Sequence, residues 1–150
     1  MAVWFEGENE IDCSIDDVRG ALDRPGELFA GITGLMPGLV SVELVEEGTD
    51  SVTIKTNEGL MTRSNISRRI EAESVVVEFD ERYEAGSTVT ATSHFTHAFS
   101  AGDTGVTHRL VISDVEAPGF LGFFYRNFGS SKTGSAFLAA HKTYFEGQDA

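Results

Sequence analysis

The 150-residue sequence has little cysteine and lysine, and it lacks any long apolar run. Cys13 is the single cysteine, which excludes an intramolecular disulfide and a metal site built from several thiolates. Nowhere do roughly 18 apolar residues follow one another, as a membrane-spanning helix requires, so we expect no integral membrane segment. The first residues show no basic segment followed by an apolar one, and we therefore expect a cytoplasmic location.

Positive charge is also scarce. Lys and Arg together number 11 and Asp and Glu number 24, which gives a formal net charge of −13. Nucleic-acid binding depends on cationic side chains that neutralise phosphates, so we exclude nucleic acid as a partner and disfavour anionic membranes. The acidic excess fits either a high-salt environment or an ordinary solvated surface, and the sequence does not separate these two explanations.

The hydrophobic period changes along the chain and predicts the order of the secondary-structure elements. Alternation over residues 2–13 predicts a strand. Ser14 precedes two acids, which is typical of a helix N-cap, and Pro25 starts a second short helix that Gly34 ends. From residue 38 to about 112 the period is two, with turn residues at intervals, which predicts six antiparallel strands.

The last apolar segment, Pro118 to Gly147, predicts a long helix, because Pro118 suits a first turn and apolar residues recur at helical spacing. Its middle, Gly129 to Ala136, is small, polar and weakly helical. We interpret the segment as one helix with room beside its thin middle, and two shorter helices with a break between them are the alternative. One domain, residues 1–150, contains all of these elements.

Alternation also predicts which strand residues share the inner face of the sheet. If the turns are tight, Phe95 lies opposite His108, and His97 becomes a diagonal neighbour of His108. The same argument places Ser64 beside Glu81 and Val77 beside Ser93. The predicted ligand-binding residues are Arg68, Val77, Phe79, Glu81, Ala91, Ser93, Phe95, His97, His108, Leu110 and Ile112 on the strands, with Phe124 and Phe128 on the helix.

An apolar face with few polar groups suits a ligand cavity, where the polar groups orient the ligand. Two plainer interpretations stay open. The charged residues can lie where the sheet opens to water, since charges are rarely buried unpaired. The histidines His97 and His108 can be hydrogen-bonded core residues.

The common catalytic motifs are absent from the sequence. It has no Gly-x-Ser-x-Gly elbow, no phosphate-binding glycine loop and no His-Glu-x-x-His pair. His94 and His97 fall on opposite faces of a strand and cannot share a metal. His141 on the terminal helix belongs to no recognisable constellation. The sequence therefore implies no metal and no redox cofactor.

The order strand, two short helices, six strands and long helix resembles the START-like (SRPBCC) superfamily, in particular its small bacterial polyketide cyclase/dehydrase-like or lipid-transport-like proteins. Three segments carry the resemblance: Met36 to Glu43, Gly105 to Leu110 and Pro118 to Phe145. It implies an α+β helix-grip fold, in which a curved seven-stranded antiparallel sheet wraps around the C-terminal helix. It also implies a cavity between them for lipids, sterols or polyketides, but no shared set of catalytic residues.

Three functions remain as hypotheses. The first is binding or transport of a hydrophobic small molecule such as a lipid or polyketide in this cavity. The second is a polyketide cyclase or dehydratase in which His97 or His108 is the acid or base, and Glu81 or Arg68 orients it. The third is a partner-binding domain with a vestigial cavity and outward groups such as Trp4. The sequence names neither the ligand nor the oligomeric state.

Overall fold

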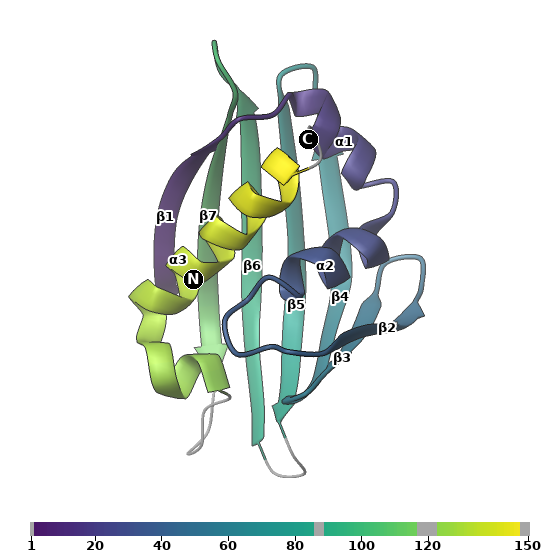
Figure 1. Cartoon of the computed structure of the whole chain (residues 1–150), viewed down its shortest axis with the longest axis vertical. Coiled ribbons are helices and arrows are strands. Elements are labelled where there is room, and N and C mark those ends of the chain that lie inside the picture. Colours follow the sequence, from purple (N-terminus) through teal and green to yellow (C-terminus); the bar gives the residue numbers. More distant parts are fainter. Residues whose placement is uncertain (1, 86–88, 117–122, 148–150) are drawn as a thin grey trace.

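Seven antiparallel strands form one sheet, and the three helices lie on one side of it (Figure 1). The computed structural model describes residues 2–85, 89–116 and 123–147, and only the backbone of residues 85, 89, 90 and 123–129. In chain order the elements are β1 (Val3–Ile11), α1 (Ile15–Ala21), α2 (Pro25–Thr33), β2 (Val42–Glu47), β3 (Val52–Thr56), β4 (Gly59–Ile70), β5 (Ser74–Ala85), β6 (Val89–Ala101), β7 (Val106–Glu116) and α3 (Phe123–Gly147). This α+β arrangement is the predicted helix-grip fold.

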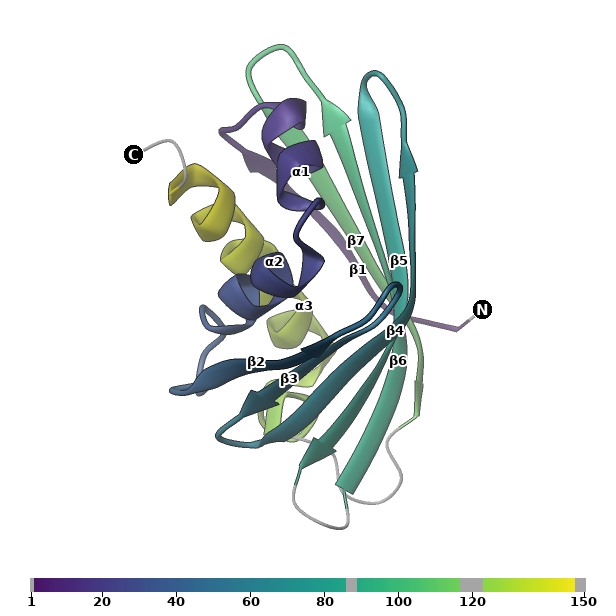
Figure 2. The same ribbon diagram turned by 90° about the vertical axis from the view of Figure 1, so that its right-hand side faces the viewer.

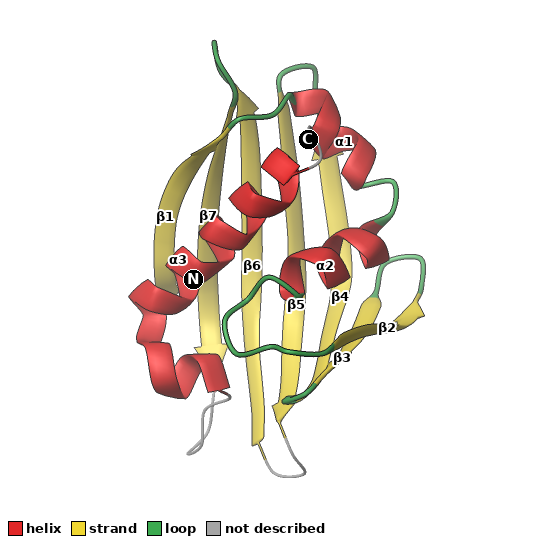
Figure 3. Cartoon of the chain, in the orientation of Figure 1, coloured by secondary structure: helices red, strands yellow, loops and turns green. Residues whose placement is uncertain are grey.

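The strand order is β1-β7-β6-β5-β4-β3-β2, so the first strand closes one edge by pairing with the last. Figure 2 shows the sheet curving around the helices, with α1, α2 and α3 all on its concave side. Figure 3 shows the helices crossing the strands obliquely. The hydrophobic core lies between these two layers and includes Ile54, Phe79, Leu110 and Phe145, each almost fully buried.

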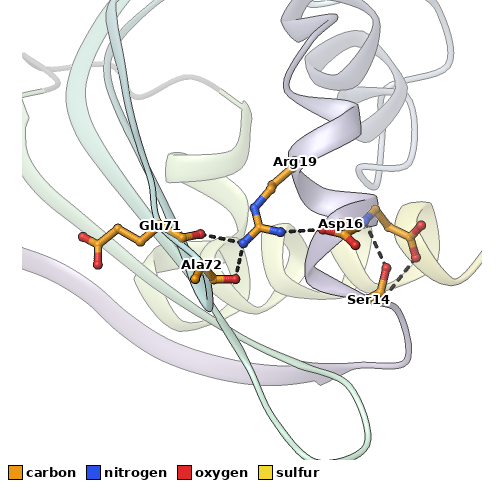
Figure 4. A network of polar contacts seen from close by, with 6 residues as sticks. Ser14, Asp16, Arg19, Glu71 and Ala72 are labelled. Atoms are coloured by element: carbon orange, nitrogen blue, oxygen red, sulfur yellow. Dashed lines mark hydrogen bonds and ion pairs between the residues drawn. The ribbon is translucent and has the colours of Figure 1, made fainter.

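Helix α1 begins as the sequence predicts. The Ser14 hydroxyl accepts a hydrogen bond from the Asp17 amide, and the Asp17 carboxylate accepts one from the Ser14 amide, which is a capping box. From the last turn of the helix, Arg19 donates hydrogen bonds to the carbonyls of Glu71 and Ala72 (Figure 4). These contacts attach α1 to the turn between β4 and β5.

Helix α3 runs without a break through its small-residue middle, so the single-helix interpretation is correct. Its predicted start at Pro118 lies outside the described residues. At Gly134, in the middle of the helix, the aromatic ring of Phe5 on β1 occupies the space that we expected to be open. A Cβ atom added to Gly134 would lie 2.3 Å from three atoms of this ring. The absence of a Cβ atom at Gly134 therefore allows β1 and α3 to approach each other.

The predicted register of β6 and β7 is wrong by four residues. His97 pairs with Leu110 and Phe99 with His108, where the sequence placed Phe95 opposite His108. The cause is the connection, which is a four-residue loop closed by a hydrogen bond from the Gly102 amide to the Gly105 carbonyl instead of a two-residue turn. A slip by an even number keeps every side chain on its face. His97 and His108 therefore remain diagonal neighbours.

Two further registers on the inner face need correction. Val77 pairs with His97, not with Ser93, because the β5–β6 register also differs from the predicted one by four residues. Between β4 and β5 a bulge falls between Ser64 and Ser67, so that Glu81 pairs with Arg63. The prediction of Ser64 at that place assumed an unbroken ladder.

Candidate functional site

Three histidines meet in the interior between the sheet and α3. His97 on β6 and His108 on β7 are diagonal neighbours on the concave face, and His141 reaches them from α3. Their exposed fractions are 3%, 0% and 4%. His97 Nδ1 and His108 Nε2 lie 2.9 Å apart and share a hydrogen bond, and the ring centroid of His141 is 4.7 Å and 4.6 Å from theirs. The interpretation of His141 as an isolated residue is therefore wrong.

The hydrogen bonds restrict which nitrogen of each ring carries the proton. His141 Nδ1 lies 2.7 Å from the Phe137 carbonyl, which can only accept, so His141 carries its proton on Nδ1 and has its lone pair on Nε2. Between His97 Nδ1 and His108 Nε2 one nitrogen donates and the other accepts, and each ring keeps one proton of its own. His108 Nδ1 is buried and finds no hydrogen-bond partner among the described residues.

Burial keeps all three rings neutral. Removal from water lowers the pKa of His97 and of His108 well below the usual value, and the neighbouring His141 lowers both further. Burial lowers the pKa of His141 to about 4, against the opposing hydrogen bond to Phe137. Each neutral imidazole at pH 7 has one nitrogen with an available lone pair.

Aromatic side chains surround the histidines. Phe99 stacks on His108 with ring centroids 4.4 Å apart and an interplanar angle of 8°. Phe79 stacks on the His97 ring at 5.7 Å, and Phe95 at 6.0 Å. The cluster therefore has an apolar shell that excludes bulk water.

A second buried polar group is the ion pair of Arg63 and Glu81, also on the concave face. Burial raises the pKa of Glu81, and the Arg63 guanidinium opposes this rise. Sequence reasoning missed Arg63 because the bulge shifts it into register. The sequence held one weak signal of this bulge, the residue type at Asn65. Asparagine tolerates the left-handed backbone region better than most residues, and Asn65 has a φ of 54° in the bulge.

Most of the predicted site residues lie where alternation placed them, in the buried interior: Val77, Phe79, Glu81, Ala91, Ser93, Phe95, His97, His108, Leu110 and Ile112. Arg68 is the exception. It lies at the exposed end of β4 and donates a hydrogen bond to the Leu22 carbonyl at the end of α1. Arg68 and Glu81 thus bind groups other than the histidines that they were expected to orient. The side chains of Phe124 and Phe128 lie outside the described residues.

The cavity beside the histidines is small. It lies at the junction of all three helices with β5 and β6, and its volume of about 10 Å³ is room for a single water molecule. Its lining residues are Val18, Leu22, Leu28, Phe29, Val77, His97, Phe99, His141 and Phe145. A space large enough for a lipid is therefore not open at this place. In the described part of the chain, no helix is long and apolar enough to cross a membrane.

No protein-family model matches the sequence, and no curated protein matches it. Solved structures match its fold. An uncharacterised protein from Rhizobium leguminosarum is 12% identical with a TM-score of 0.63, and the match covers 95% of this chain and 93% of that one. A STAR-related lipid transfer protein from Xanthomonas axonopodis is 13% identical with a TM-score of 0.57, covering 93% and 84%.

A third similar structure is the Zhui aromatase/cyclase from Streptomyces sp. R1128, at 15% identity and a TM-score of 0.51, with 97% of this chain and 94% of that chain covered. Identities this low show the fold alone. The chain has the START-like (SRPBCC) fold, as its sequence predicted.

Proposed function

We propose that the chain binds a hydrophobic small molecule between the sheet and the helices, beside the three histidines. The observation that carries this proposal is the lining of the cavity at that place. Apolar side chains surround it except where the rings of His97 and His141 reach it. An apolar lining with a few polar groups is typical of sites for small organic ligands.

The position of the cavity explains how it can admit a molecule larger than water. Helices α1, α2 and α3 supply one wall, through residues such as Val18, Leu28 and Phe145, and strands β5 and β6 supply the other. An outward movement of the helices by a few ångströms enlarges this space without breaking a hydrogen bond between strands. The similar structures include a lipid transfer protein and an aromatase/cyclase, which supports ligand binding in this fold.

The charges around the cavity restrict the chemical class of the ligand. His97 and His141 are neutral, so they can orient a hydroxyl or a carbonyl group but provide no positive charge for an anion. Among the described residues, Arg63 is the cation whose charge acts on His97 and His141, and it is paired with Glu81. The ligand class is therefore an uncharged, largely apolar molecule with one or two oxygen atoms.

Nile red, an uncharged fluorescent probe, tests this proposal. We expect the protein to bind Nile red, and Val77→Phe, which fills the cavity, to abolish binding. The milder Leu28→Phe provides a second filled cavity if Val77→Phe does not fold. Val45→Phe is the matched control, because Val45 is 53% exposed on the edge strand β2. Absence of Nile red binding in the wild type, or equal binding by all four proteins, would show that the interior is a filled core.

Acid–base catalysis is the second candidate, favoured by the hydrogen bond between His97 at the cavity and His108 behind it. A base at this place can take a proton from a bound substrate, since both rings are neutral. His108→Gln keeps a hydrogen-bonding group at the position. Turnover of a polyketide-like substrate that is lost in this variant while Nile red binding persists would favour an enzyme. Unchanged turnover would exclude this role for His108.

A further inference from the structure

We propose that His97, His108 and His141 form a binding site for one divalent transition-metal ion, with zinc as the reference ion. One ring nitrogen from each residue lies within 4.8 Å of the others. The three residues come from three different elements, β6, β7 and α3, so only the folded chain assembles the set. This proposal concerns a metal ion beside the cavity in which the organic ligand is proposed to bind, and it does not rest on that binding.

The donor atoms select the class of metal. Three imidazole nitrogens suit zinc, cobalt, nickel or copper, whereas magnesium and calcium require oxygen donors. Among the described residues, Glu81 is the acidic residue that is buried, and it is paired with Arg63. The cluster therefore offers nitrogen ligands without a competing oxygen donor.

The hydrogen bonds show which nitrogen each ring would offer. Nε2 of His141 has the lone pair because Nδ1 donates to the Phe137 carbonyl, and a backbone carbonyl on the second nitrogen is a common way to hold a metal-binding imidazole in place. His97 Nδ1 and His108 Nε2 already face each other. In the metal-bound protein the ion lies between these two nitrogens, and the proton that joined them moves to the other nitrogen of its own ring, so that both rings stay neutral.

The distances require only small movements. Zinc–nitrogen bonds of about 2.0–2.1 Å in a tetrahedron place ligand nitrogens about 3.3 Å apart. His97 Nδ1 and His108 Nε2 are 2.9 Å apart, so they separate by about 0.4 Å to fit. One nitrogen of each ring lies within 4.8 Å of the others, so a pair drawn from that set has to close by about 1.5 Å at most. Rotations of the rings can supply this change.

The fourth coordination position faces the small cavity. His97 and His141 line that cavity, and its volume of about 10 Å³ is room for one water molecule. Three protein ligands and one water form the open type of zinc site, in contrast to structural sites with four protein ligands. The apolar shell of Phe99 and Phe145 would keep other water away from the ion.

Cobalt provides the test, because its visible absorption reports coordination directly. The protein, without an affinity tag, is unfolded in chelator and refolded with Co²⁺, since the site is buried. We expect one Co²⁺ per chain and the strong absorption of a four-coordinate ion. Titration of Zn²⁺ into the cobalt protein should remove this absorption.

Variants separate the cluster from adventitious binding. His141→Leu and His97→Gln each remove one ligand and should weaken Co²⁺ binding roughly 100-fold or more, since even second-shell changes cost 10- to 100-fold. Two positions are used so that the test can still be made if one variant fails to fold.

His94→Ala is the matched control, because His94 lies on the opposite face of the sheet and contacts Asp80. Failure of the wild type to bind Co²⁺, or equal binding by all variants, would overturn the proposal. Nile red binding by metal-free protein tests the proposed function separately.

Discussion

Arg63 and Glu81 face each other across β4 and β5 inside the fold, with Arg63 Nε 3.2 Å from Glu81 Oε2. Their exposed fractions are only 1% and 4%. The Arg63 guanidinium also lies over the rings of Phe29, Phe79 and Phe95, at 4.7, 4.4 and 5.7 Å from their centroids. A charge in such surroundings is tolerated only with a partner, so each of the two residues makes the other possible.

Removal of one member of this pair should be far more harmful than removal of both. We expect Arg63→Met to lower the free energy of unfolding by about 3–5 kcal/mol, because it leaves the Glu81 carboxylate buried without its cation. Glu81→Leu should cost a similar amount, and the double variant should recover most of the loss. Urea denaturation of the four proteins measures this double-mutant cycle.

The exposed pair of Arg82 and Glu84 provides the control for this cycle. Arg82→Met should cost less than about 1 kcal/mol, because solvent screens a surface ion pair. If Arg63→Met were as mild as Arg82→Met, the buried pair would have no role in stability.

Tyr83 should make the protein sensitive to alkaline pH. Its hydroxyl lies 3.3 Å from Thr56 Oγ1, and burial raises the pKa of Tyr83 to about 12, above the value of about 10 in an unfolded chain. Between these two values the unfolded chain loses the proton and the folded chain keeps it, so stability falls as the pH rises. From pH 9 to 11.5 we expect this residue to account for a loss of about 2 kcal/mol.

The comparison of wild type with Tyr83→Phe isolates this contribution. Phenylalanine has no proton to lose, so the variant should lose about 2 kcal/mol less than the wild type over the same pH range. Urea denaturation at pH 9 and at pH 11.5 gives both differences. Equal losses in the two proteins would show that Tyr83 is not responsible.

Gly134 should not tolerate alanine, although alanine favours helices. The added methyl group would lie 2.3 Å from the ring of Phe5, and overpacking of this kind costs about 1–3 kcal/mol. Contacts of 2.3 Å with three ring atoms place the cost toward the upper end of this range, above the gain of about 1 kcal/mol from helix propensity. Thermal unfolding should therefore show a destabilised Gly134→Ala variant.

Gly20→Ala is the matched control, because Gly20 also lies in a helix and an added Cβ there would meet nothing within 4 Å. We expect Gly20→Ala to be stabilising by roughly 0.5–1 kcal/mol. Phe5→Leu should in addition relieve part of the cost of Gly134→Ala. A stabilised Gly134→Ala variant would contradict the close packing of β1 on α3.

The order of elements and the face of each strand residue could be predicted because they depend on local periodicity. The pairing of His97 with Leu110 could not, because it depends on the length of a loop. The predicted diagonal contact of His97 with His108 is still correct. A slip of four residues keeps both side chains on the inner face of the sheet and leaves them only two positions apart. Periodicity also gave no sign of Arg63, which a bulge shifts into register with Glu81.

His141 shows the other limit of sequence reasoning. Helical spacing indicates which side of α3 faces the sheet, and His141 lies on that side next to Ala140 and Phe137. It does not indicate how far along the strands the helix packs. Only the packing of α3 over β6 and β7 places the His141 ring next to the other two histidines.

Arg19 should control the stability of the turn between β4 and β5. It donates to the carbonyls of Glu71 and Ala72 and also pairs with Asp16, and its side chain is 26% exposed (Figure 4). Hydrogen bonds from charged groups contribute about 1.5–3 kcal/mol when buried, so in this partly exposed position we expect Arg19→Met to cost about 1–2 kcal/mol. Hydrogen exchange of the amide of Glu71, which donates to the Ser74 carbonyl, should become faster.

The control for this last variant is Arg24→Met, since Arg24 is 79% exposed and its ion pair with Glu27 is 3.6 Å long. We expect no change in the exchange of the Glu71 amide, because Arg24 makes no contact with the turn in the described structure. Faster exchange in Arg19→Met alone would show that α1 holds the turn through this one side chain. Equal exchange in both variants would mean that the turn is stable by its own hydrogen bonds.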